Sequence, residues 1–357
     1  MEINMKEMER ELYRADQLPV FQNWMYNSAD EARSCPRGDM RLVQQAETGL
    51  VYNAAFQPEL MIYGPQYQNE QAVSPLFHQH LEKVSGIVAQ NIGLAALVEI
   101  GCGKGYFLEM LQKRNGDIIG FDPAYEGNNS AIQQNYFTKK TGIKAKGLIL
   151  RHVLEHIPNP LSFLSDLKKA NGGGGLIYIE VPCFDWICAR RAWFDIFYEH
   201  VNYFRLTDFQ RMFGRILESG RLFGGQYLYV VAELSTLTKP RNNDAGGVDF
   251  PEDFFFDFHE NKNPEEIVIW GGASKGVIFA LQKERAGQPV KLVIDINPEK
   301  QGKYLAATGL QVHSPKDGLA KLPKDSIIYV MNSNYVGEVR AMTNNMYEYI
   351  GVDNGWL

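Results

Sequence analysis

Acidic side chains and glycines surround two predicted strand ends in a spacing that suits a ribose-containing ligand. Glu99 precedes the glycine-rich run Gly101–Gly105 (GCGKG), where an apolar stretch gives way to a helical pattern. Glycine is needed there because a Cβ would block both the tight turn and the approach of a ligand to backbone N–H groups. About twenty residues later Asp122 ends the next apolar stretch, where a carboxylate can accept from both hydroxyls of a ribose. A purely structural turn and a nucleotide site are the alternatives.

A second group of titratable side chains follows the apolar run at residues 147–150. His152, Glu155 and His156 lie just beyond it, and ligands of open α/β sheets bind at the carboxyl ends of strands. The pattern HxxxEH also suits a metal, but its order differs from HExxH and no further ligand cluster is evident in the sequence. We therefore expect a ligand-binding role and no metal ion.

A third group is the adjacent pair Glu199 and His200 within an aromatic segment, residues 194–204. A low dielectric and a carboxylate neighbour both tune an imidazole toward acid and base work near neutral pH. The pair therefore forms a candidate acid/base site. The alternative is that buried His and Glu only brace a helix end.

The elements that would position these groups alternate between strands and helices, which indicates βαβ units and a parallel sheet. Amphipathic patterns predict helices at 76–92, 106–113 and 161–170. Apolar runs predict strands at 95–100, 117–121, 147–150, 176–181 and 226–233.

A change of composition divides the chain. Residues 236–248 collect Pro, Asn, Asp and Gly without apolar periodicity, which predicts a linker. A second α/β unit follows, with strands at 267–270, 292–296 and 326–331, a GGASKG turn and a helix to about residue 283. We expect an α/β protein with four parts: a small cap or lid at 1–75, a Rossmann-like domain at 76–235, the linker, and a second Rossmann-like domain at 249–357.

Composition limits the classes of partner. The 357 residues carry a formal net charge of −6 with dispersed Lys and Arg, which argues against a nucleic-acid-binding face and favours small molecules. No apolar run is long enough to span a membrane, and the first residues are charged, so we expect a cytoplasmic protein without a membrane partner. The four cysteines are too few for a disulfide scaffold and are expected to be reduced and buried. A homo-oligomer is left open.

The E-x-G-x-G-x-G run with an acid at the next strand end resembles the S-adenosylmethionine site of class I methyltransferases, unlike the GxGxxG of dinucleotide enzymes. The resemblance implies S-adenosylmethionine as methyl donor, with Asn135 against its adenine. Together with the residues above, it implies a donor site made of Tyr67, Glu99, Gly101, Cys102, Gly103, Gly105, Asp122, Pro123, Asn135 and His152.

From about residue 40 to 335 the chain resembles the three-domain sugar C-methyltransferases, which act on nucleotide-linked keto-deoxysugars in antibiotic and polysaccharide pathways. The motifs that carry this resemblance are VEIGCGKGYFLEML, RHVLEHIPNP, IYIEVP, FYEHVNYF, GGQYLYVV, GASKG and DINPEKQGKY. The last two are diagnostic because a generic methyltransferase has no second α/β unit that carries them.

The resemblance also implies roles for single residues. His200 would remove the proton beside the sugar ketone with Glu199 as its partner, His156 would be a further active-site histidine, and Tyr67 a lid tyrosine near the donor. Phe197 stands where the family usually has a tyrosine, and Tyr198 is displaced by one residue.

A second departure concerns the N-terminal module, where the family normally uses four zinc-binding cysteines. The matching segment, residues 42–51, has no cysteine. We therefore expect no zinc there, and packing alone must hold the cap.

Together these features predict methyl transfer to a carbon next to a carbonyl of a nucleotide-linked sugar or similar biosynthetic intermediate. His200 would be the general base and Glu199 its partner, with His156 and Tyr198 as further catalytic residues. The candidates to stabilise an enolate oxygen are Tyr198, Tyr203, His156 or a backbone N–H. An O- or N-methyltransferase of a sugar or natural product is the first alternative. A protein that binds S-adenosylmethionine without turnover is the second.

Overall fold

A computed structural model describes residues 9–62, 74–243, 246–255, 267–324 and 326–353. The predicted lid residue Tyr67 lies outside the described residues. Three sheets organise the described residues, and the α-helices among them have between 5 and 17 residues. Within the described residues no helix combines the length and apolar character that crossing a membrane requires.

The central sheet has seven strands in the order β10-β11-β8-β7-β4-β5-β6. Its first five strands in the chain pair in parallel, and the last two are antiparallel to their neighbours. The strands are β4 (Leu97–Ile100), β5 (Ile118–Phe121), β6 (Ile132–Gln133), β7 (Gly147–Arg151), β8 (Leu176–Pro182), β10 (Ile216–Leu222) and β11 (Tyr227–Glu233). Parallel strands need crossover connections, and helices lie in those from β4 to β5 and from β7 to β8.

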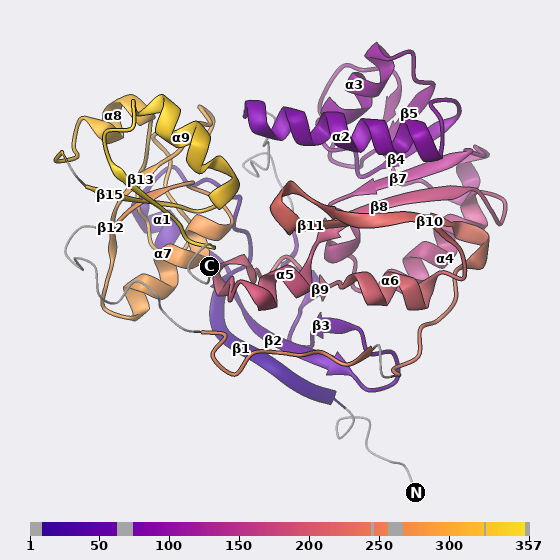
Figure 1. Cartoon of the computed structure of the whole chain (residues 1–357), viewed down its shortest axis with the longest axis horizontal. Helices are drawn as coiled ribbons and strands as arrows, with labels where there is room; N and C mark the ends of the chain where they lie inside the picture. Colours follow the sequence, from indigo (N-terminus) through magenta and orange to yellow (C-terminus); the bar gives the residue numbers. More distant parts are fainter. Residues whose placement is uncertain (1–8, 63–73, 244–245, 256–266, 325, 354–357) are drawn as a thin grey trace, which may run out of the picture.

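Helices cover both faces of the central sheet (Figure 1). On one face pack α2 (Pro75–Asn91) and α3 (Tyr106–Lys113), whose apolar residues share one core cluster. On the other lie α4 (Pro160–Ala170), α5 (Phe184–Ala189) and α6 (Leu206–Met212). Ser74 caps α2 by accepting from the Phe77 N–H, so the sequence marks the start of that helix locally.

The N-terminal part forms a four-stranded antiparallel sheet in the order β1-β2-β3-β9. Its strands are β1 (Glu9–Pro19), β2 (Arg37–Gln45) and β3 (Val51–Asn53), with β9 (Asn202–Tyr203) supplied from far along the chain. The helix α1 (Ala29–Arg33) connects β1 and β2. The sequence predicted only short packed pieces here, because the alternation of β1 is interrupted by two register shifts.

The third sheet is parallel throughout, in the order β14-β13-β12-β15-β16. It consists of β12 (Ile267–Trp270), β13 (Val290–Ile294), β14 (Val312–His313), β15 (Ile327–Val330) and β16 (Glu348–Gly351), with helices α7 (Lys275–Arg285), α8 (Pro315–Leu319) and α9 (Val336–Met342). The fold is therefore α/β, with a Rossmann-like central unit and an additional C-terminal parallel sheet, as the sequence predicted.

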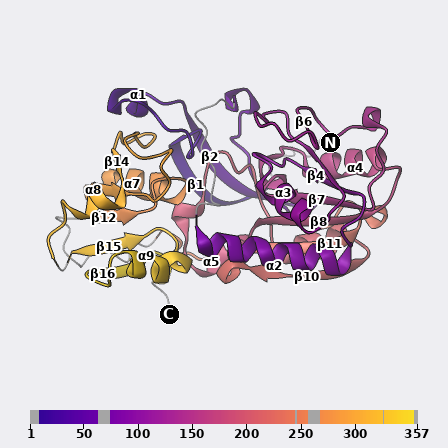
Figure 2. The ribbon, with the colours of Figure 1, turned by 90° about the horizontal axis from the view of Figure 1, so that it is seen from above.

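One apolar core runs through all three sheets. Tyr26 and Tyr304 pair across the N-terminal and C-terminal parts, and Trp193 stacks on Phe279 with ring centroids 5.6 Å apart. In Figure 2, α1 lies beside the C-terminal sheet, where the Ala307 N–H donates to the Ala32 carbonyl. The described residues of the predicted linker run along the N-terminal sheet, since Gln44 donates to the Gly246 carbonyl.

All four cysteines are buried and none forms a disulfide. Of these, Cys102 lies in the glycine turn and Cys183 directly follows β8.

Candidate functional site

The turn between β4 and α3 is built on three glycines with positive φ: Gly101 at 69°, Gly103 at 54° and Gly105 at 82°. A Cβ at Gly101 would come within 2.5 Å of the Val153 side chain, and one at Gly105 within 2.4 Å of Ile132. A Cβ at Gly103 would meet no atom within 4 Å. The outer two glycines therefore allow close packing, whereas the middle one faces open space.

Asp122, at the carboxyl end of β5, is joined directly to this turn. Its Oδ2 accepts from the Gly103 N–H at 2.8 Å, and its Oδ1 accepts from the Ala124 N–H at 2.8 Å. Pro123 beside it is exposed, and Asn135 is exposed just beyond β6. The structure thus brings the predicted acid and glycines together at one edge of the sheet.

Glu99 lies within β4, two residues before the turn, and is 3% exposed. Its Oε2 has no hydrogen-bond partner in the part of the chain that the structure describes. Burial raises the pKa of Glu99 to about 8; the charge of Arg151 opposes this rise and that of Asp122 adds to it. The side chain therefore stays protonated at neutral pH, beneath the backbone that makes the turn.

A buried carboxylate that the sequence analysis did not single out organises the neighbouring strands. Glu180 in β8 is fully buried; its Oε2 accepts from the Tyr178 hydroxyl at 2.7 Å, and its Oε1 lies 3.2 Å from His80 Nε2. Burial disfavours its charge, but Arg151, His152 and His80 outweigh that effect and hold the pKa of Glu180 well below its usual value. An acid inside the apolar run IYIEVP was the signal that could have found it.

His152 links this carboxylate to the segment after β7. Its Nε2 lies 3.1 Å from Glu180 and its Nδ1 lies 3.4 Å from Glu155. Burial works against the charged imidazole, but the two carboxylates prevail and raise the pKa of His152 to about 9. The residue also has a φ of 53°, so its backbone is strained where the chain leaves the sheet.

Residues 154–157 are held against the aromatic segment by side-chain bonds to the backbone. Asn202 Nδ2 donates to the Ile157 carbonyl at 2.6 Å and to the Leu154 carbonyl at 3.4 Å. His156 Nδ1 lies 2.8 Å from the Glu199 carbonyl oxygen and donates to it. Because Val153 of the same segment packs on Gly101, the histidines are tied to the glycine turn.

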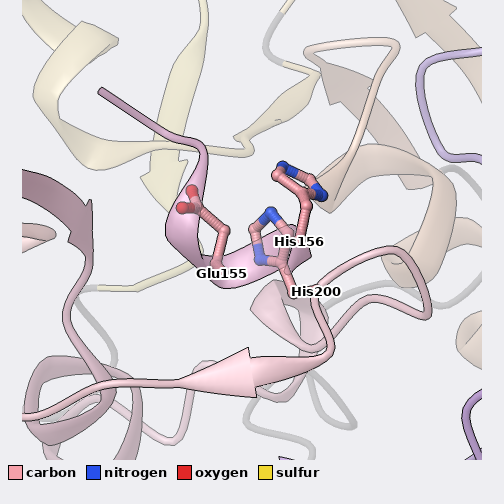
Figure 3. Close-up of side chains that lie close together, drawn as sticks. All are labelled: Glu155, His156 and His200. Atoms are coloured by element: carbon pink, nitrogen blue, oxygen red, sulfur yellow. The ribbon is translucent and has the colours of Figure 1, made fainter. Parts of the chain in front are cut away.

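These contacts gather Glu155, His156 and His200 into one cluster (Figure 3). In this view the His200 imidazole lies between the Glu155 carboxylate and the His156 ring, and the two rings meet edge to face with centroids 4.8 Å apart. Burial, and then the charges of His156 and His152, hold the pKa of His200 well below its usual value. The ring is surrounded by protein but remains partly accessible.

The residues flanking His200 face different ways. The Phe197 ring contacts the His200 ring with centroids 4.7 Å apart. Tyr198 instead packs toward the N-terminal sheet: its oxygen accepts from the Gln57 N–H at 2.8 Å, and its ring stacks on Phe56.

Glu199 is buried, and its Oε1 accepts from the Gln22 N–H at 3.4 Å. Its carboxylate therefore anchors the N-terminal part of the chain, while its carbonyl orients His156. The structure brings His200, Glu199 and His156 together. The catalytic roles expected for them, and for Tyr198, remain predictions.

Comparison with known proteins agrees with the central fold. Residues 69–216, fewer than half of the chain, match the family model described as a methyltransferase domain. No curated protein sequence matches the chain.

Three of the similar solved structures illustrate the range of the likeness. An S-adenosylmethionine-dependent methyltransferase from Archaeoglobus fulgidus is 16% identical, with 43% of this chain and 94% of that chain covered and a TM-score of 0.30. Magnesium protoporphyrin IX methyltransferase from Synechocystis, with bound S-adenosylmethionine, is 16% identical, with 48% and 88% covered and a TM-score of 0.33.

The third is 1,6-didemethyltoxoflavin-N1-methyltransferase from Burkholderia thailandensis, with its bound 1,6-didemethyltoxoflavin and S-adenosylhomocysteine. It is 11% identical, with 52% of this chain and 95% of that chain covered and a TM-score of 0.34. The assignment rests on the family model: residues 69–216 contain a methyltransferase domain, and the protein is a methyltransferase.

Proposed function

We propose that this methyltransferase takes its methyl group from S-adenosylmethionine and places it on a carbon next to the carbonyl of a nucleotide-linked sugar. The donor supplies a methyl group already activated on a sulfonium. The residues around the glycine turn fit such a molecule, because Gly103 leaves room for it and Asp122 holds a carboxylate at the same edge. Asn135, exposed beyond β6, is the candidate for the adenine.

The class of acceptor follows from the resemblance to sugar C-methyltransferases. Its motifs lie in the central sheet and continue into the C-terminal parallel sheet, which carries GASKG after β12 and Asp295 after β13. We assign residues 76–235 to methyl transfer, 1–75 to a cap that works without the zinc cysteines of the family, and 249–357 to a second Rossmann-like domain joined by 236–248.

The observation that carries the proposed chemistry is the edge-to-face pair of the His156 and His200 imidazoles, next to the segment that packs on Gly101. The lowered pKa of His200 keeps its ring unprotonated at neutral pH, so that a nitrogen lone pair is available to accept a proton. The Glu199 carbonyl fixes the Nδ1 proton of His156 and leaves Nε2 as acceptor. His200 thus removes the proton from the acidic carbon, while the protein aligns that carbon with the donor methyl.

Proton exchange without the donor tests this step directly. The full chain is incubated in D₂O with candidate nucleotide-linked keto-sugars, and loss of the hydrogen next to the ketone is followed by NMR. We expect enzyme-dependent exchange that disappears in His200→Asn. Labelled S-adenosylmethionine is then added, and mass spectrometry locates the transferred methyl group. Exchange that survives in His200→Asn contradicts His200 as the base.

A second candidate function, O- or N-methylation, is favoured by one observation. The apolar ring of Phe197 contacts His200 where the related enzymes usually have a phenol, so a donor of hydrogen bonds to an enolate is missing at this position. In that case His200 would deprotonate a hydroxyl or amine. Phe197→Tyr distinguishes the two: it should raise C-methylation if an enolate forms, and leave O- or N-methylation unimproved.

A further inference from the structure

Glu155, His156 and His200 also have the geometry of a metal site. One ligand atom from each residue lies within 4.8 Å of the others. The ligand atoms of a tetrahedral zinc ion lie about 3.4 Å from one another at ordinary metal–ligand distances. Side-chain rotations that move the ligand atoms of these residues by about 1 Å would therefore bring them to that spacing. We propose that these three residues bind a single divalent transition-metal ion of the zinc, cobalt or nickel class.

The orientation of His156 supports this assignment independently of the spacing. Metal-binding imidazoles commonly donate their second N–H to a carbonyl or carboxylate, which fixes the ring and directs the other nitrogen to the metal. His156 has this arrangement, with Nδ1 2.8 Å from the Glu199 carbonyl oxygen. Its Nε2 is therefore the nitrogen left with a lone pair for the cluster.

Glu155 supplies the second independent observation. Its side chain is almost fully buried, yet neither carboxylate oxygen has a hydrogen-bond partner among the described residues. The nearest cation is His152, whose Nδ1 lies 3.4 Å from Oε1. The ion pair with His152 offsets part of the cost of burying Oε1, whereas Oε2 has no hydrogen-bond partner among the described residues. A metal cation held by this carboxylate would remove the remaining cost.

The donor set indicates the class of ion. Two imidazoles and one carboxylate suit zinc and its first-row neighbours, whereas magnesium and calcium prefer oxygen ligands alone. Three protein ligands leave one position open for water or another oxygen donor. If His200 is the base, as we proposed above, the ion would occupy the lone pair that accepts the proton, so metal binding and methyl transfer would exclude each other.

Direct metal binding tests the site without any donor or acceptor. Chelator-treated full-length protein is titrated with Co²⁺ and followed by visible absorption, and with Zn²⁺ by calorimetry. We expect one ion per chain, with affinity reduced roughly tenfold or more in each of Glu155→Gln, His156→Asn and His200→Asn. His313→Asn, which changes a histidine of the C-terminal sheet, is the matched control and should bind as wild type does.

Thermal unfolding checks that each variant is folded and gives a second readout, because an ion that binds only the folded state raises Tm. Zn²⁺ should raise Tm in the wild type and in His313→Asn, but not in the ligand variants. If Glu155→Gln fails to fold, the two histidine variants decide, because both histidines are partly exposed residues. Absence of stoichiometric binding, or equal affinity in all variants, overturns the site.

The consequence for activity is tested separately. Zn²⁺ should inhibit methyl transfer, and a chelator should restore it. Binding at the three residues without inhibition would leave the metal site in place and contradict His200 as the base. If the wild type binds no metal ion but His200→Asn loses activity, the metal site is contradicted and His200 as the base is supported.

Discussion

The central sheet and the C-terminal sheet of this protein each carry a glycine-rich turn of the same design. After β4, the Gly103 N–H donates to Asp122 at 2.8 Å; after β12, the Gly272 N–H donates to Asp295 at 2.7 Å. In both cases the acid follows the next parallel strand along the chain. The local arrangement of glycine turn and carboxylate is therefore shared.

The surroundings of the two turns differ. A Cβ at Gly103 would meet open space, whereas one at Gly272 would lie 3.1 Å from Val293 and Val312. Ser274 in the second turn has a φ of 35°, and its hydroxyl donates to Asn23 Oδ1 at 3.0 Å, within the N-terminal part. The first turn thus leaves room for a ligand, and the second is covered by the chain itself.

The strands beneath the turns differ as well. Glu99 stands two residues before Gly101, and Ile269 stands two residues before Gly271. Both side chains are buried, but only the first is ionisable. The comparison teaches that a glycine turn can serve binding or packing, and that the neighbouring residues decide which.

The largest effect should come from the histidine tied to the first turn. His200→Asn should lower kcat by about 10²- to 10⁴-fold, the usual contribution of a general base, with donor binding unchanged. His313→Asn in the C-terminal sheet should leave kcat as it is. Steady-state kinetics with the acceptor, and calorimetry for the donor, measure both. Full turnover in His200→Asn would favour an acceptor that needs little base assistance.

Alanine at one glycine of each turn should separate packing from binding. A Cβ at Gly276 would lie 1.9 Å from the Gly271 carbonyl oxygen, so Gly276→Ala should destabilise the fold by about 3 kcal/mol or more. Gly103→Ala has space for its methyl group and should cost only about 1 kcal/mol for its positive φ. The methyl group added in Gly103→Ala would instead stand where we propose that the donor binds. Denaturant unfolding should show the larger loss of stability in Gly276→Ala, and calorimetry should show the larger loss of donor affinity in Gly103→Ala. Equal donor affinity in both variants would contradict the difference between the two turns.

The two acids should differ in the same sense. Asp122→Ala should weaken S-adenosylmethionine binding by about 1.5 to 3 kcal/mol, the scale of hydrogen bonds to a charged group. Asp295→Ala should reduce the free energy of unfolding, because it leaves the buried Gly272 N–H unpaired, but donor affinity should not change. Calorimetry on both proteins checks this, and unchanged affinity in Asp122→Ala would contradict the donor site.

The smallest effect concerns the strand acid. The pKa of Glu99 is raised from 4.5 to about 8 in the folded protein, so deprotonation favours the unfolded state as pH rises through this window. The wild type should therefore lose about 2 kcal/mol more stability between pH 6 and pH 8 than Glu99→Gln does. Urea unfolding at both pH values measures the difference. Parallel pH profiles would show that Glu99 is charged in the folded protein.

Much of the fold was accessible from the sequence because its signals are local. The apolar runs placed β4, β7, β8 and β12 to within about two residues, and the helix predicted at 106–113 coincides with α3. The N-terminal sheet was not predicted as such. Its last strand, β9, comes from the segment at 202–203, and pairing between such distant residues leaves no local pattern.

The candidate site divides in the same way. The turn has glycine at three positions, and an acid follows the next strand. Because both features belong to short segments, the sequence by itself predicted the place of a site for a ligand with a ribose. It also determined the α/β class, because alternating apolar runs and amphipathic helices can bury their surfaces only in layers.

Tertiary structure alone decided which side chains meet there. Glu180 and His80 lie 100 positions apart and join through burial in a common core, while Glu155 and His200 meet because Asn202 and the Glu199 carbonyl bind residues 154–157. It also decided that the turn at Gly103 stays open while the one at Gly272 is covered by Val293 and Val312. Such contacts depend on how the layers pack, and packing between residues distant in the chain is not encoded in any single segment.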